Sequence, residues 1–143
     1  MMAEQINIFA ENKQGRLNTI TGILFENDVN IRAIVIADRE KFGVIKILVD
    51  KPLTAYKALT DAGLACALKK VLAIIMDDKA GGLHDLTKTF SGRGIDIIDA
   101  YGFVIKSNMK AVLCVEVKDY DSAKAVVEDN GFRILADSDL YKL

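Results

Sequence analysis

The chain has 143 residues, of which 51% are hydrophobic and 27% are charged, a composition that is typical of globular proteins and excludes a disordered chain. Nineteen Lys and Arg residues stand against twenty Asp and Glu residues, so there is no positive excess for binding a nucleic-acid backbone. No apolar run approaches the ~20 residues that cross a bilayer, and the N-terminus lacks the pattern of a signal peptide. We therefore expect a cytoplasmic protein that binds neither nucleic acid nor membrane.

The first half of the chain alternates between strand and helix patterns. Residues 5–9 form a short apolar run that predicts a strand ending at a polar turn. From Gly15 the apolar residues fall at helical spacing as far as Asn27. Alternating residues predict strands at 29–37 and 44–49, joined as a hairpin by four charged residues. Pro52 suits the first turn of a second helix, which ends at Gly63 and is followed by a short strand at 64–68.

The second half repeats this order at a nearly constant spacing. The predicted elements are strand 71–76, helix 83–92, strands 95–105 and 110–117, helix 121–130 and strand 132–135. The stripe of Leu17, Ile20 and Leu24 recurs 66 residues later as Leu83, Leu86 and Phe90. An internal repeat of this length indicates two structural units. We place the first domain at residues 1–69 and the second, with a C-terminal tail, at residues 70–143, with Lys69 and Lys70 as the link.

Each unit therefore reads strand, helix, strand, strand, helix, strand, which predicts the α+β class and a ferredoxin-like βαββαβ arrangement with both helices on one face of an antiparallel sheet. The other face should be uncovered, and we assign to it Ile34, Ile36, Leu48, Val112 and Cys114. Because soluble monomers rarely expose such an apolar patch, we expect a homodimer. The apolar residues of the tail, Leu140, Tyr141 and Leu143, are expected to pack rather than fray.

Catalytic chemistry finds little support in the sequence. Cys66 and Cys114 lie far apart within apolar patterns and resemble reduced core residues, and His84 is the single histidine. Neither cysteine has a base nearby in sequence, and no ligand spacing matches a metal site. We expect no enzyme activity, no metal and no cofactor. A small ferredoxin-like enzyme of the acylphosphatase type, using Arg16 with Asn12 or Asn30, is the weakest alternative because the glycine-rich phosphate cradle is missing.

Two glycine-centred turns are the most specific signals, because each follows an apolar strand and opens a helix whose first N–H groups face outward. They are Asn12-Lys13-Gln14-Gly15-Arg16-Leu17 and Asp78-Lys79-Ala80-Gly81-Gly82-Leu83, and each is followed by a second-strand start, Asn30-Ile31 and Asp96-Ile97. These motifs, over residues 4–137, resemble the ACT domain, a small-molecule regulatory module of amino-acid metabolism. The chain has Gln14 and Ala80 where that family usually has proline.

The resemblance implies that two ACT units align side by side and bind amino acids at their junction. The ligand-binding residues it implies are Asn12, Gln14, Gly15, Arg16, Leu17, Asn30, Ile31, Asp78, Gly81, Gly82, Leu83, Asp96 and Ile97. We expect one tight site, in which the first loop takes the ligand carboxylate and Asp96 its ammonium group, because Asp78 would repel a carboxylate at the second loop.

The predicted function is therefore a non-catalytic regulatory protein that binds an amino acid and senses or controls amino-acid metabolism. Its expected partners are the amino acid, a second copy of the chain and a metabolic enzyme. The alternative is a ligand-free dimerisation or interaction module that assembles with a partner enzyme.

Overall fold

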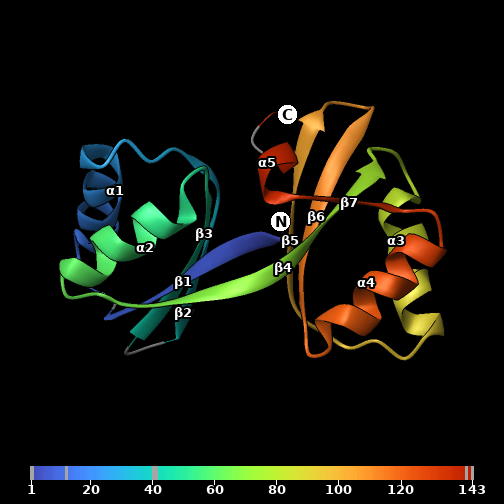
Figure 1. Ribbon diagram of the computed structural model, residues 1–143, viewed down its shortest axis with the longest axis horizontal. Coiled ribbons are helices and arrows are strands. Elements are labelled where there is room, and N and C mark those ends of the chain that lie inside the picture. Colours follow the sequence, from blue (N-terminus) through green and yellow to red (C-terminus); the bar gives the residue numbers. More distant parts are fainter. Residues whose placement is uncertain (1, 12, 40–41, 141, 143) are drawn as a thin grey trace. The chain divides into compact units, whose positions relative to one another are not determined.

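The structure is a computed structural model that describes residues 2–11, 13–39, 42–140 and 142. The chain divides into two compact units (Figure 1). The N-terminal unit comprises residues 4–69, and the C-terminal unit comprises residues 70–143 together with residues 1–3.

The N-terminal unit has two helices on one face of a four-stranded sheet (Figure 1). Its strands lie in the order β2-β3-β1-β4, and the β1–β3 and β2–β3 pairs are antiparallel. Its elements are β1 (Ala3–Glu11), α1 (Arg16–Glu26), β2 (Ile31–Arg39), β3 (Phe42–Val49), α2 (Pro52–Asp61) and the first part of β4 (Ala65–Asp77).

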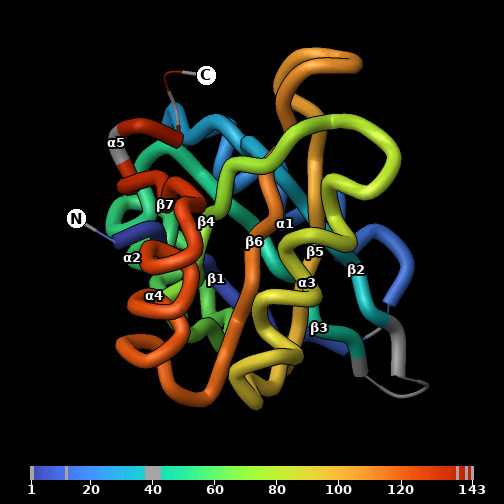
Figure 2. The backbone as a smooth tube through the Cα atoms, turned by 90° about the vertical axis from the view of Figure 1, so that its right-hand side faces the viewer, coloured from blue at the N-terminus to red at the C-terminus, as the bar shows by residue number. Residues whose placement is uncertain are grey.

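The C-terminal unit repeats this arrangement, with strands in the order β5-β6-β4-β7 and antiparallel pairing of neighbours. Its helices α3 and α4 lie side by side (Figure 2). Its elements are the second part of β4, α3 (Gly82–Gly92), β5 (Ile97–Lys106), β6 (Lys110–Val117), α4 (Tyr120–Asp129), β7 (Arg133–Leu135) and the short α5 (Asp137–Leu140). The predicted α+β class and the two βαββαβ units are thereby confirmed. Among the described residues, no helix is both long enough and apolar enough to cross a membrane.

Each unit has its own core between helices and sheet, and the repeat supplies equivalent residues to both. In α1 the buried residues are Ile20 and Leu24, and in α3 they are Leu86 and Phe90, at the same spacing of 66. In α2 and α4 the buried pairs are Ala55 with Leu59 and Ala123 with Val127. Since burying a Leu or Phe side chain contributes ~1.5–3 kcal/mol, these stripes hold each helix pair on its sheet.

The predicted separation of strands 64–68 and 71–76 by Lys69 and Lys70 is wrong, although the boundary between the two compact units does fall between these lysines. Both lysines are exposed, but β4 runs without interruption from Ala65 to Asp77 and contributes a strand to each unit. Two exposed polar residues do not end a strand when their backbone stays extended. Of the predicted ordered tail, Leu140 is buried, whereas Tyr141 and Leu143 lie outside the described residues.

The assignment of Ile34 and Ile36 to the face away from the helices is also wrong. Between Ile31 and Ala33 the register with β3 shifts, because two steps along β2 match one step along β3. Such a bulge moves every following side chain to the opposite face. Ile34 and Ile36 consequently pair with Ile47 and Ile45, which belong to the core under the helices. The other residues assigned to the uncovered face, Leu48, Val112 and Cys114, are buried. The homodimer stays a prediction that none of these five residues supports.

Candidate functional site: the loop after β1

The Gly15 loop joins β1 to α1 by a tight turn. The Lys13 N–H donates to the Glu11 carbonyl at 2.8 Å, and the Arg16 N–H donates to the Lys13 carbonyl at 3.1 Å. Gly15 has φ 83°, a left-handed conformation that residues with a side chain adopt only at a cost. Gly15 also provides no side chain to cap the helix, and no other side chain of the described residues does so. Among these residues, the N–H groups of the first turn of α1 therefore have neither an intrahelical acceptor nor a side-chain cap.

A cavity of about 200 Å³ opens beside this loop, entirely within the N-terminal unit. Two cross-strand pairs line it: the large apolar pair Ile36 and Ile45, which we call its floor, and the small pair Ala10 and Gly43. Its lining residues are Ala10, Glu11, Lys13, Gly15, Arg16, Leu17, Ile36, Gly43 and Ile45. The cavity is thus apolar at its floor and charged on the side of the loop.

On the charged side of the cavity, the described residues Lys13 and Arg16 carry positive charge and Glu11 carries negative charge. Lys13 pairs with Glu11 at 2.7 Å, and this hydrogen-bonded lysine holds the pKa of the Glu11 carboxyl below its usual range. The Nε of Arg16 is buried and has no hydrogen-bond partner among the described residues. Furthermore, the first turn of α1 carries no acidic residue. The guanidinium and the helix N-terminus together favour an anion at this point.

The equivalent loop of the C-terminal unit is tied down instead. Gly81 has φ 87° and starts α3 in the same way. However, Lys110 pairs with Asp77 at 2.7 Å, and the Asp78 carboxylate accepts the Asn108 N–H at 2.7 Å. Both figures show the β5–β6 hairpin at the same end of the unit as this loop. These bonds hold the loop against the hairpin, and the carboxylate of Asp78 is engaged in one of them.

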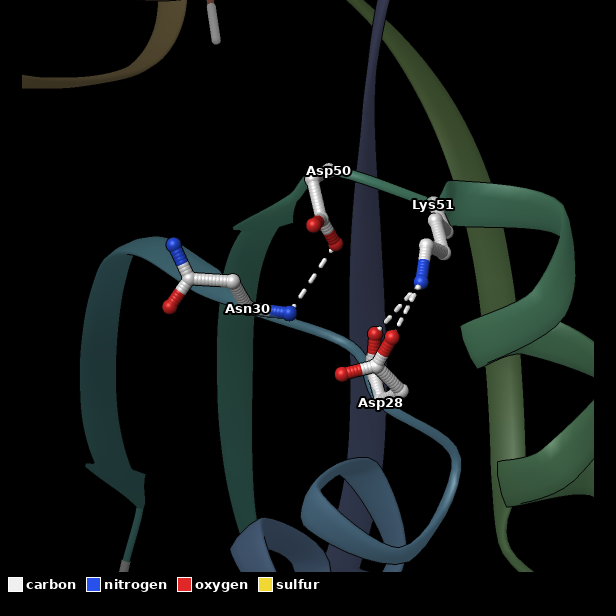
Figure 3. A network of polar contacts seen from close by, with 4 residues as sticks. All are labelled: Asp28, Asn30, Asp50 and Lys51. Atoms are coloured by element: carbon white, nitrogen blue, oxygen red, sulfur yellow. Dashed lines mark hydrogen bonds and ion pairs between the residues drawn. The ribbon is translucent and has the colours of Figure 1, made fainter.

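The two strand starts also differ. In the N-terminal unit the Asn30 N–H donates to the Asp50 carboxylate at 2.9 Å, and the Lys51 ammonium donates to the Asp28 carbonyl and carboxylate at 2.7 and 3.0 Å (Figure 3). Asn30 is exposed, and Ile31 packs against the core. These bonds join the segment before β2 to the segment between β3 and α2.

In the C-terminal unit the exposed Asp96 lies instead on a cavity of about 370 Å³, which is lined by Arg93, Gly94, Ile95, Asp96, Lys118, Asp119 and Ser122. Asp119 caps α4 by accepting from the N–H and hydroxyl of Ser122, which keeps the pKa of its carboxyl low. Ile97, the residue predicted beside Asp96, pairs with Val117. Of the two carboxylates that line this cavity, Asp119 is therefore a helix cap and Asp96 is not.

Within a unit, the predicted loop residues and the predicted strand-start residues do not meet. Ile36 lies beside the Gly15 loop, and Ile31 lies five residues back along the same strand, which is a distance of ~16 Å. Of the predicted loop residues, Gly15, Arg16 and Leu17 line the cavity, Gln14 is exposed, and Asn12 lies outside the described residues. In the second loop, Gly82 is buried and Leu83 is exposed.

Sequence reasoning missed six cavity residues: Ala10, Glu11, Lys13, Ile36, Gly43 and Ile45. The alternation of β2 would have placed Ile36 correctly only if the bulge had been recognised, and the sequence carries no glycine or proline that marks it. No three His, Cys, Asp or Glu side chains of the described part of the chain are grouped as metal ligands.

The chain matches the family model described as "ACT domain pair" over residues 1–143. No curated protein matches it in sequence. Among solved structures, it is similar to protein BT0572 from Bacteroides thetaiotaomicron, with 34% identity, a TM-score of 0.92, and coverage of 100% of this chain and 98% of that one.

Two more distant structures share the fold. The regulatory subunit of aspartate kinase from Thermus thermophilus, in a ligand-free form, has 15% identity and a TM-score of 0.62 over 92% of this chain and 94% of that one. The corresponding subunit from Thermus flavus has 12% identity and a TM-score of 0.60 over 91% and 94%. With the family model covering its whole length, this chain belongs to the ACT domain family as a tandem pair of ACT domains.

Proposed function

We propose that this protein is a non-catalytic regulator that binds an amino acid and thereby senses or controls amino-acid metabolism. The observation that carries the proposal is the cavity beside the Gly15 loop, where an apolar floor faces a guanidinium whose Nε has no partner among the described residues. Ligand sites commonly combine an apolar lining with a few polar groups that fix orientation.

The family and its relatives support a regulatory role over a catalytic one. The Thermus neighbours are regulatory subunits of an enzyme by their descriptions, although at 15% and 12% identity they share only the fold with this chain. A cysteine nucleophile is also disfavoured, because burial raises the pKa of Cys114 to about 12 and keeps its thiol protonated.

A ligand-free module that assembles with an enzyme is the second candidate, and one observation favours it. Phe25, near the end of α1, and Leu53, at the start of α2, are strongly exposed, and the Lys51–Asp28 contact holds these two ends together. At the equivalent positions the C-terminal unit has Ser91 and Asp121. Large apolar side chains that gather on one surface are typical of protein interaction sites.

A thermal-shift screen of the intact chain against the twenty amino acids separates the two candidates. A ligand at one hundred times its dissociation constant stabilises the folded state by ~2.7 kcal/mol, which raises the melting temperature by several degrees. A response to at least one amino acid is expected. If none of the twenty shifts the melting temperature at millimolar concentration, the sensor proposal is wrong and the interaction module takes its place.

A further inference from the structure

We propose that the cavity beside the Gly15 loop takes an amino acid with an uncharged, branched aliphatic side chain, and that the Gly81 loop has no such site. This inference rests on the proposed function and adds the class of ligand and the choice between the two loops.

The floor of the cavity determines which side chain fits. Leu17 and Ile36 leave 40% and 54% of their surface exposed, and both line the cavity together with the buried Ile45. Each large apolar side chain that remains in water carries an unfavourable hydration cost, which a bound aliphatic group would remove. A polar ligand side chain would instead lose its water without gaining a hydrogen-bond partner from these three residues.

The charges exclude the basic amino acids. Among the described lining residues, Arg16 and Lys13 outnumber Glu11, whose carboxylate is already paired with Lys13. A ligand ammonium or guanidinium side chain would therefore meet an uncompensated positive charge, whereas the α-carboxylate can pair with Arg16 and the first turn of α1. An acidic side chain would be attracted by the cations, but it would have to lie on the apolar floor.

The volume of the cavity suits a small side chain. An apolar cavity of ~150 Å³ can hold a benzene-sized molecule, so about 200 Å³ accommodates a three- or four-carbon side chain with part of its backbone. An indole side chain together with its backbone would extend beyond this space into solvent. Valine, leucine and isoleucine match both the volume and the lining.

The repeat shows how the second loop differs. Met76 occupies the position of Ala10 and packs against the C-terminal core, and Gly102 replaces the floor residue Ile36. Gly82 stands at the position of Arg16, and a Cβ there would collide with the Asp77 carbonyl oxygen. The second loop thus has a long side chain where the first has space, and its backbone leaves no room for a residue equivalent to Arg16.

Isothermal titration of the intact chain tests the inference with L-valine, L-leucine, L-isoleucine, L-lysine, L-aspartate and L-tryptophan. Ala10→Met introduces the methionine of the second loop into the first cavity and should abolish aliphatic binding. Ile36→Ala alters a half-exposed floor residue. It should weaken that binding about tenfold, because the ligand loses an apolar contact with the isoleucine side chain. Met76→Ala, the matched change in the other unit, should leave both affinity and one-site stoichiometry unchanged. Melting curves without ligand establish that each variant is folded.

The outcomes separate this inference from the proposed function. Binding of lysine, aspartate or tryptophan in preference to the aliphatic amino acids would overturn the ligand class while leaving the sensor role intact. Two equal sites per chain, or aliphatic binding that survives both Ala10→Met and Ile36→Ala in folded protein, would overturn the location. The absence of binding by any amino acid would overturn the proposed function itself.

Discussion

Replacing Arg16 by methionine should stabilise the ligand-free protein while weakening its binding of ligand. A buried donor without a partner costs ~1–3 kcal/mol. The Nε of Arg16 is such a donor, but the side chain as a whole is half-exposed, so the cost lies near the lower limit. Methionine keeps the apolar stem, forms helix well and has no donor. We therefore expect a gain of about 1 kcal/mol, which for a chain of this length raises the melting temperature by about 3 °C.

With ligand present, the order of stability should reverse. Arg16 contributes a charge-assisted hydrogen bond to the carboxylate worth ~1.5–3 kcal/mol, and its loss should weaken binding by about 10- to 150-fold. Urea unfolding with and without L-leucine measures both effects. Arg133→Met, which changes an exposed arginine of the C-terminal unit, is the control and should alter stability by less than ~0.5 kcal/mol. If Arg16→Met destabilises the free protein by more than 1 kcal/mol, the arginine is a structural residue and the reasoning is refuted.

Four further predictions concern the rest of the chain. Gly82→Ala should lower the free energy of unfolding by ~1–3 kcal/mol, because the new Cβ meets the Asp77 carbonyl. Gly22→Ala, in the open interior of α1, should raise it by ~0.5–1 kcal/mol. Equal effects in thermal unfolding would show that the second loop adapts freely. Asp119→Ala should lower the melting temperature at pH 7 by removing the α4 cap. Since the folded pKa of Asp119 is lowered, its contribution is present above the unfolded value of ~3.9 and is lost as the pH falls through the folded pKa, so the variant and the wild type should converge in acid. Cys114, with a pKa of about 12, should resist iodoacetamide at pH 8 until the protein is unfolded, and rapid labelling under native conditions would contradict its burial. Light scattering should return a multiple of the 15.7 kDa chain mass at micromolar concentration, and the monomer mass would exclude the homodimer.

The repeat made most of the fold predictable. Leu24 and Phe90, for example, occupy equivalent positions of α1 and α3. The apolar pattern of one half could therefore be compared with that of the other. Boundaries were less predictable where backbone bonds extend a helix end. Val29, predicted as the first strand residue, donates its N–H to the Leu24 carbonyl at 2.9 Å, and β2 starts only at Ile31.

The candidate site was predictable in its loop and not in its cavity. Gly15 is marked in the sequence by a turn pattern, because a left-handed residue between a strand and a helix favours glycine. Ala10, Ile36 and Gly43 come together only through the pairing of three strands. That pairing depends on a bulge that local sequence does not determine. The bonds that fasten Asp78 to the β5–β6 hairpin are likewise tertiary contacts between residues 30 positions apart.

Titration of the ¹⁵N-labelled intact chain with L-leucine, followed by NMR of its backbone amides, tests the central claim most directly. Our account predicts that the resonances of Gly15, Leu17 and Ile36 shift with the ligand concentration, while those of Gly81, Gly82 and Leu83 stay unchanged. Shifts concentrated at residues 81–83, or none near Gly15 at saturating ligand, would contradict it.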